Sequence, residues 1–215
     1  MRKVLGGLCL LALAGSGVAG AQTIRFGVHG VSLTHNEVKK EKGADGTGFG
    51  GVTELRVGRL HFEAKVYHAQ LSPWLESDTV EFKATQLDIR VSFRVAPGIA
   101  LEAGGGRRWI RPELAAQEVG FIRLGAVSEN QVARIASVWV RGAYLVRPQF
   151  GGGGEAGLAV ELGLGAGVGT ANGRFRVRAE YEFQRIDRRS YPQGLEIKVP
   201  IQMAVARFGV ELGLW

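Results

Sequence analysis

The chain has 215 residues, a length that suits one domain or a small pair of domains. Its formal charge of +7 is a mild basic excess, and the charges alternate in sign instead of forming a basic patch with aromatic platforms. The sequence therefore argues against a nucleic-acid partner. The only cysteine is Cys9, so residues 22–215 hold no disulfide and no cysteine metal site.

Residues 1–21 have the pattern of a secretory signal peptide. Arg2 and Lys3 form a basic start, Val4 to Leu13 form an apolar run, and Ala19 to Ala21 form a small-residue cleavage site. The apolar run is shorter than the roughly 20 residues that a transmembrane helix needs. We expect export with cleavage near Ala21, which leaves residues 22–215 as one domain. Without Arg2 and Lys3, 25 basic residues face 20 acidic ones, a net charge of +5.

The stretch RFRVRAEYEFQ, from Arg174 to Gln184, alternates polar and apolar residues over its whole length. Successive side chains of a β-strand point to opposite sides, so this alternation predicts a two-faced strand. Similar segments recur along the chain, beginning near residues 23, 49, 60, 79, 99, 118, 132, 155, 173 and 195. They predict ten strands, or eight if two pairs of segments merge.

The connections between these segments are of two kinds. Tight turns are expected at 58–59, 97–98, 128–131 and 171–173. Longer, exposed loops are expected at 34–48, 72–78, 111–117, 148–154 and 185–194, and PELAAQ at 112–117 is the one stretch with helical spacing. Short turns at one end and longer loops at the other are typical of outer-membrane barrels.

These features predict an all-β fold, a single antiparallel transmembrane β-barrel. Most segments reach the 9–11 residues that a tilted membrane-spanning strand needs, whereas strands of soluble proteins are usually about 5–6 residues long. A soluble, secreted lipocalin-like barrel is the alternative architecture. Its apolar face would point inward and enclose a ligand.

Residues 22–215 as a whole resemble the small outer-membrane β-barrel proteins of Gram-negative bacteria, of the OmpA/OmpX-like and porin-superfamily type. The resemblance lies in the signal peptide, the two-residue repeat, the turn and loop asymmetry and the terminal aromatic Trp215. It implies a place in the bacterial outer membrane, contact with outer-membrane lipid, and recognition of the C-terminal strand by the barrel-assembly machinery. Phe208, Val210 and Leu212 alternate out of phase with Trp215, and a bulge at Gly213 would restore the phase.

Charged residues of both signs occupy the polar face of strand after strand, and we expect them to form a charge network in the lumen. Barrels of about eight strands are filled by side chains, whereas open aqueous channels occur at about 16–18 strands. A ten-stranded lumen is therefore expected to be plugged, with a narrow pore for small polar solutes as the alternative. The expected network comprises Arg56, Glu63, Lys65, Asp88, Arg90, Arg176, Arg178, Glu180 and Glu182.

Four tryptophans, Trp74, Trp109, Trp139 and Trp215, are expected in the aromatic girdles at the membrane interfaces. No catalytic site is expected. The best pairing of a histidine with a nearby serine is His68 with Ser72, and polar residues at a barrel rim are mostly solvated structure. No ligand spacing supports a metal site at His29 and His61, and no cofactor is expected. The sequence thus predicts a structural or surface-exposed outer-membrane protein and names no extracellular partner.

Overall fold

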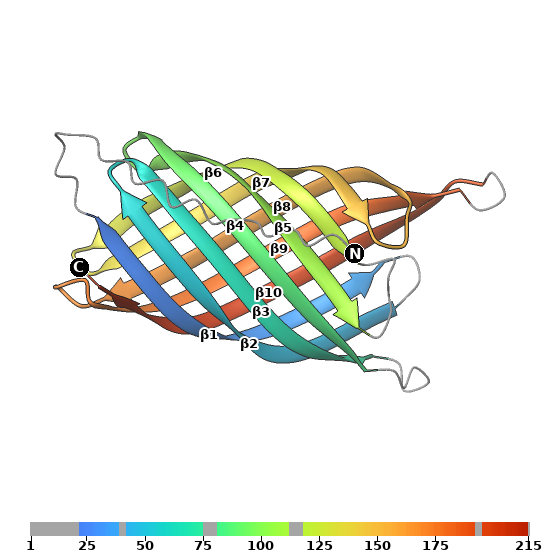
Figure 1. Ribbon diagram of the computed structural model, residues 1–215, viewed down its shortest axis with the longest axis horizontal. Helices are drawn as coiled ribbons and strands as arrows, with labels where there is room; N and C mark the ends of the chain where they lie inside the picture. Colours follow the sequence, from blue (N-terminus) through green and yellow to red (C-terminus); the bar gives the residue numbers. More distant parts are fainter. Residues whose placement is uncertain (1–21, 39–41, 75–80, 112–117, 192–194, 215) are drawn as a thin grey trace, which may run out of the picture.

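The computed structural model describes residues 22–38, 42–74, 81–111, 118–191 and 195–214, and these ranges form ten antiparallel strands. The strands close into one barrel in which each pairs with its neighbours in sequence and β1 pairs with β10 (Figure 1). The all-β, ten-stranded barrel expected from the sequence is confirmed. The strands are β1 Thr23–Glu37, β2 Lys42–Val57, β3 Leu60–Pro73, β4 Phe82–Ala96, β5 Ile99–Arg111, β6 Val119–Ala133, β7 Ala136–Phe150, β8 Glu155–Gly169, β9 Phe175–Ser190 and β10 Ile197–Gly213.

The two ends of the barrel differ in their connections (Figure 1). At one end, here called the turn end, tight turns join β2 to β3, β4 to β5, β6 to β7 and β8 to β9. Gly58 and Gly98 lie in two of these turns at φ 58° and 71°, a left-handed conformation that favours glycine. The other end, here called the loop end, carries the remaining connections. The chain therefore alternates between the two ends with an even number of strands.

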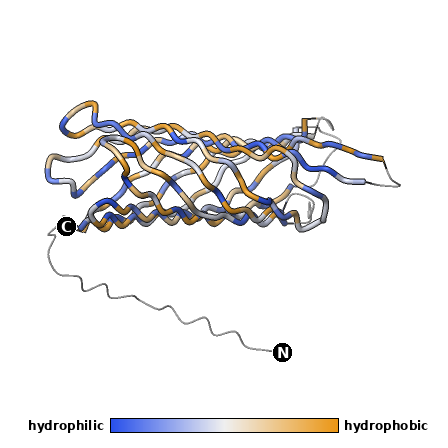
Figure 2. The backbone as a smooth tube through the Cα atoms, turned by 90° about the horizontal axis from the view of Figure 1, so that it is seen from above, coloured by the Kyte–Doolittle hydropathy of each residue, from blue (hydrophilic) through white to orange (hydrophobic). Residues whose placement is uncertain are grey.

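The outer wall of the barrel is apolar around its middle. Val140, Leu162 and Phe208 point outward and keep 62%, 58% and 65% of their surface exposed. Hydrophobic and hydrophilic residues alternate along the strands over most of the barrel wall (Figure 2). An apolar exterior around a charged interior is the reverse of a soluble lipocalin-like barrel, so that alternative is wrong.

Glycines on the inward side of β2 let its backbone come close to β3. A Cβ added at Gly46 or Gly48 would lie 1.8 Å from the Gln70 carbonyl oxygen or 1.9 Å from the His68 carbonyl oxygen. Real Cβ atoms do not approach oxygen that closely, so this part of the wall accepts only glycine. Glycine at such positions is the usual mark of a close backbone approach in a strand.

Several expected boundaries are wrong. Residues 185–194 were expected to be loop, yet β9 continues to Ser190, and β7 continues to Phe150 within the loop expected at 148–154. Most of 34–48 was expected to be loop, yet β1 continues to Glu37 and β2 already begins at Lys42. Residues 128–131 were expected to be a turn, but they belong to β6, and the turn to β7 lies at Arg134 and Ile135. Residues 34–37 and 128–131 are polar on both faces, and 42–48 is rich in glycine, so the two-residue alternation that reveals a half-buried strand is lost there.

The C-terminal strand keeps its register. β1 and β10 pair without a shift from Glu37 opposite Ile201 to Arg25 opposite Gly213, so no bulge occurs in β10 up to Gly213. Trp215 and the expected helical turn at 112–117 lie outside the described residues. Within the described ranges, no helix is long and apolar enough to cross a membrane.

Candidate functional site: the filled lumen

The lumen changes in character from the turn end to the loop end. Along β3, the inward residues are first Glu63 and Lys65, then Tyr67, and finally Ala69 and Leu71. β4 runs the other way and carries the same order in reverse, from Phe82 and Ala84 through Gln86 to Asp88 and Arg90. The side chains thus form a charged layer, a polar layer and an apolar layer, stacked along the barrel axis.

Arg178 on β9 is the centre of the charged layer. Its guanidinium group bonds Glu63 Oε2 at 2.9 Å and Glu180 Oε2 at 2.6 Å, contacts Glu54, and lies 3.4 Å from Glu211 Oε1. These carboxylates come from β2, β3, β9 and β10, so one cation ties together strands far apart in sequence. A guanidinium carries five donors in a planar fork, which suits several carboxylates at once.

Lys65 and Arg207 share the carboxylate of Glu180 with Arg178. Lys65 Nζ lies 2.6 Å from Glu180 Oε1 and 3.1 Å from Glu63 Oε1. Arg207 Nη1 lies 3.0 Å from Glu180 Oε1 and 3.4 Å from Glu182 Oε2. Glu180 is therefore held by three cations, which compensates the cost of burying its charge.

A second group of ion pairs lies against β4, β6 and β8. Arg90 Nη2 is 2.6 Å from Glu182 Oε2 and 3.1 Å from Glu161 Oε1. Arg123 Nη2 is 2.5 Å from Asp88 Oδ1 and 2.9 Å from Glu161 Oε2. Since Glu161 binds both arginines and Glu182 also binds Arg207, the two groups form one continuous network.

The charges of this network balance. Apart from Glu37 near the loop end, eight buried carboxylates face eight buried cations. Such a lumen carries little net charge, so it gives no strong preference for ions of either sign. The carboxylates are Glu54, Glu63, Asp88, Glu102, Glu161, Glu180, Glu182 and Glu211, and the cations are Lys65, Arg90, Arg108, Arg123, Arg141, Arg176, Arg178 and Arg207.

The polar layer separates the charges from the apolar layer. Arg108 donates from Nε to Gln86 Oε1 at 2.9 Å and also contacts Gln184. The Tyr67 hydroxyl donates to Gln86 Oε1 at 3.1 Å and lies 3.8 Å from the Met203 sulfur. These groups satisfy one another where the lumen passes from ionic to apolar.

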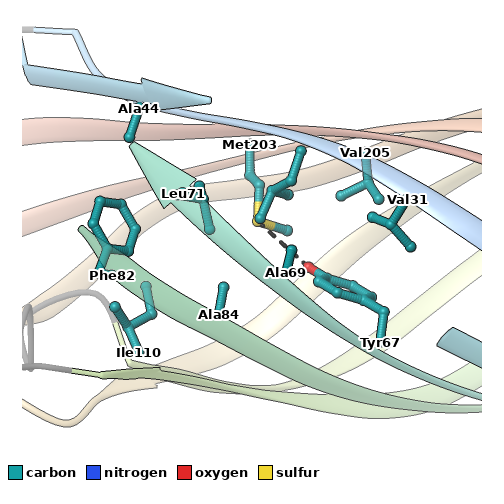
Figure 3. Packing of buried hydrophobic residues seen from close by; sticks show 11 residues of the cluster. Val31, Ala44, Tyr67, Ala69, Leu71, Phe82, Ala84, Ile110, Met203 and Val205 are labelled. Atoms are coloured by element: carbon teal, nitrogen blue, oxygen red, sulfur yellow. Dashed lines mark hydrogen bonds between the residues drawn. The ribbon is translucent and has the colours of Figure 1, made fainter. Parts of the chain in front are cut away.

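Apolar side chains fill the lumen toward the loop end (Figure 3). Leu71, Phe82 and Ile110 are at most 5% exposed and pack in one cluster with Met203 and Val205. A second cluster lies on β6 to β10 and includes Phe121, Leu145, Phe150, Ile186 and Ile201. Hydrophobic constrictions close pores by excluding water.

The space left inside is small. Two cavities beside the charged layer measure about 20 and 30 Å³, one next to His29 and Lys65 and the other next to Trp139 and Arg141. A single water needs at least about 10–15 Å³ of such volume, so each cavity takes one or two waters. These two cavities are too small to form an aqueous channel, and buried side chains occupy the described lumen around them.

All nine residues of the expected lumen network lie on inward positions, and eight of them are buried. Arg56 is the exception, because it sits at the turn end, where its Nη2 lies 3.3 Å from Glu129 Oε1. Apart from Glu37, eight further buried charges lie outside those nine: Glu54, Glu102, Arg108, Arg123, Arg141, Glu161, Arg207 and Glu211. The last two lie on β10. They alternate in phase with Met203 and Val205, so extending the inward phase along the last strand would have found them.

The tryptophans divide between the two faces. Trp109 points outward on β5, and half-exposed Trp74, just after β3, donates to Asp45 Oδ2 at 2.6 Å. Trp139 was expected at the membrane interface, and this is wrong: it is buried in the lumen, with the Arg178 guanidinium 4.6 Å from its ring centre. The two-residue alternation of β7 explains the inward position of Trp139, because it places Trp139 on the same face as Arg141. Trp215 lies outside the described residues.

His68, the best catalytic candidate in the sequence, contacts Thr85 in the structure. His68 and Ser72 point outward on β3, and His68 Nδ1 lies 2.8 Å from Thr85 Oγ1 of the neighbouring strand. Among the described residues, no group of three histidine, cysteine, aspartate or glutamate side chains could hold a metal ion. His29 and His61 point inward near different ion pairs.

Comparisons with known proteins give the fold. No protein-family model matches the sequence, and no curated protein resembles it significantly. The outer membrane protease OmpT from Escherichia coli is similar in structure, with a TM-score of 0.50 and 9% identity over 94% of this chain and 99% of that chain. At this identity the likeness concerns the fold alone, and the fold is that of an outer-membrane β-barrel.

Two smaller likenesses are with a Neisserial surface protein and a porin. Neisserial surface protein A, NspA, has a TM-score of 0.41 and 13% identity, over 88% of this chain and 96% of that chain. The KdgM porin, solved with disordered oligogalacturonate, has a TM-score of 0.37 and 10% identity, over 86% of this chain and 98% of that chain.

Proposed function

We propose that this chain, which has the fold of the outer-membrane β-barrel proteins, is a closed barrel of the bacterial outer membrane that displays its loop end at the cell surface. The observation that carries the proposal is the combination of an apolar outer wall with a lumen filled along its length. An apolar wall requires lipid around it. A filled lumen leaves the exposed connections, and not transport, as the means of contact with the surroundings.

The orientation follows from the two ends of the barrel. Outer-membrane barrels have short turns on the periplasmic side and longer loops outside. Near the loop end, outward positions become polar, as at Thr47 and Gln70, so the wall continues beyond the apolar band there. The strands have 13–17 residues, more than the 9–11 needed to cross, and the excess length carries the loop end into water.

The lumen contents favour a plug over a pore. A conducting barrel needs a continuous aqueous path, whereas this lumen has a neutral ionic layer and an apolar layer in series. A catalytic role has no support in the lumen or on the described outer wall, because His68 contacts a threonine and no metal-binding group is present in those residues.

Site-directed labelling tests both the location and the orientation. Residues 22–215 contain no cysteine, so a single introduced thiol can be read without background. We choose Gly152→Cys, in the exposed loop-end connection after β7, and Ala171→Cys, in the exposed turn after β8. The two positions flank the same strand and serve as each other's control.

On intact cells, a membrane-impermeant maleimide is expected to label the Gly152→Cys variant and not the Ala171→Cys variant. After the outer membrane is permeabilised, both variants should react. Labelling of Ala171→Cys on intact cells would reverse the orientation. Recovery of the protein in the soluble fraction would overturn the membrane location itself.

A further inference from the structure

The mouth of the barrel at the turn end contains a cavity that has no part in closing the lumen. Its larger part measures about 460 Å³ and lies between the turns that join β2 to β3, β4 to β5 and β6 to β7. A second part of about 280 Å³ continues toward the β8–β9 turn. The two parts share Arg56, Glu129, Gln131 and Ser137, so we treat them as one turn-end vestibule.

The vestibule is strongly basic, in contrast to the balanced lumen behind it. Six arginines line it, and Glu129 is the one acidic residue among the described residues of its lining. Arg176 is paired with Glu54 and Glu211 in the neutral charged layer, so the charge of the other five arginines is not cancelled from below. The arginines are Arg25, Arg56, Arg59, Arg94, Arg134 and Arg176.

Three of these arginines have no carboxylate partner within the described part of the chain. Arg59, Arg94 and Arg134 are exposed, and none of them takes part in an ion pair there. The backbone places the first two together, because the Arg94 amide donates to the Arg59 carbonyl oxygen at 2.9 Å. Two guanidinium groups thus enter the larger part of the vestibule from adjacent chain segments.

Further donors in the vestibule also lack a protein acceptor. Arg56 Nε, Arg25 Nε and His61 Nε2 are shielded from solvent and have no hydrogen-bond partner among the described residues. His61 Nε2 lies 3.8 Å from Glu54 Oε2, beyond hydrogen-bond distance. Buried polar groups are normally hydrogen-bonded, so these unpaired nitrogens leave the wall of the vestibule with positive polarity that the described residues do not satisfy.

We propose that the turn-end vestibule binds a small polyanion, a molecule with two or more carboxylate or phosphate groups. Guanidinium forks match the geometry of both groups and bind them through paired, charge-assisted hydrogen bonds. Both parts of the vestibule approach or reach the 300–1,000 Å³ of typical ligand sites. The ionic layer closes the inner side, so the anion is held at the mouth and does not pass through.

Calorimetric titration of the folded chain in non-ionic detergent tests this site, with citrate and pyrophosphate as probes. Citrate presents carboxylates and pyrophosphate presents phosphates, so the pair also distinguishes the two chemistries. Binding of at least one probe at one site per chain is expected, weakening as salt rises. The absence of binding by both probes, or binding only after anionic phospholipid is added, would overturn the proposal.

Variants then locate the site. The double variant Arg59→Gln/Arg94→Gln should bind the probe at least about tenfold more weakly, since a hydrogen bond to a charged group contributes more than a neutral one. Lys83→Gln/Arg107→Gln removes the same two charges from exposed, outward positions near the loop end and is the matched control. Equal weakening in both variants would show a nonspecific charge effect and overturn the assignment.

A third variant is expected to change the affinity for the probe in the opposite direction. Glu129→Gln removes the acidic residue of the vestibule and frees Arg56, whose Nη2 lies 3.3 Å from the Glu129 carboxylate. Binding of the probe should become several-fold tighter, a result that misfolding cannot produce. Unchanged or weaker binding in a variant that still shows the heat-dependent gel shift of a folded barrel would contradict the proposal.

Discussion

Lys65 on β3 and Glu180 on β9 meet inside the barrel, with Nζ 2.6 Å from Oε1, although 115 residues separate them in the sequence. Both side chains are buried, and Arg178 and Arg207 share the same carboxylate. The pair therefore joins opposite parts of the wall through the lumen. Its neighbours make the interior a connected ionic structure instead of a set of separate bridges.

Glu180→Gln should destabilise the barrel strongly. The change leaves Lys65, Arg178 and Arg207 short of one negative charge in a buried setting. Breaking a buried ion pair by removing one partner costs about 3–5 kcal/mol, so the free energy of unfolding should fall by about that amount. Urea titration of the protein folded into lipid vesicles measures it.

The matched control for this change is Glu196→Gln. Glu196 lies 3.5 Å from Lys198 and 3.7 Å from Arg189, and all three side chains are about 40% exposed or more. Exposed pairs contribute about 0–1 kcal/mol, so this variant should unfold almost like the unchanged protein. Equal losses in the two variants would show that the lumen network does not stabilise the fold.

Gly48→Ala should impair assembly of the barrel. The added methyl group would lie 1.9 Å from the His68 carbonyl oxygen and 2.6 Å from the Ala69 Cα, both backbone atoms that cannot move alone. Gly142→Ala is the control, because its methyl group meets only the Leu162 side chain at 3.6 Å. The fraction of protein that shifts in gel mobility on heating should drop for the first variant and stay high for the second.

Leu164→Arg tests which face meets lipid. Leu164 points outward from the middle of β8 and is 56% exposed. A lipid-facing arginine near the bilayer centre costs about 2–4 kcal/mol, and one near the interface about 0–1 kcal/mol. Thr47→Arg, outward on β2 between Ser32 and Gln70, is the interfacial comparison. Similar unfolding free energies for the two variants would argue against an apolar band embedded in lipid.

The alternation of residues was enough to predict the fold, because a strand with one face toward lipid and one toward a charged lumen repeats every two residues. Arg176, Arg178, Glu180 and Glu182 are inward in the structure as their phase predicts. The level of each side chain along the axis could not be predicted. It depends on the register of ten strands at once, which a single sequence does not contain.

The apolar layer at the loop end was missed for a different reason. Leu71 and Phe82 are as hydrophobic as lipid-facing residues, and composition alone assigns them to the outer wall. Their phase is the useful signal, since Leu71 is in phase with Lys65 and Phe82 with Asp88. The strand ends at 42–48 and 128–131 were not predicted, because a glycine-rich stretch and a stretch with polar residues on both faces both resemble loops.

Single-channel recording in planar lipid bilayers tests the central claim, that a neutral ionic layer and an apolar layer close the lumen in series. The refolded protein, shown by its heat-dependent gel shift to be inserted as a barrel, should give no discrete conductance steps. The KdgM porin reconstituted in the same way serves as the control for detecting a channel. Reproducible, stable steps from the unchanged protein would mean that ions cross the lumen and would contradict the account.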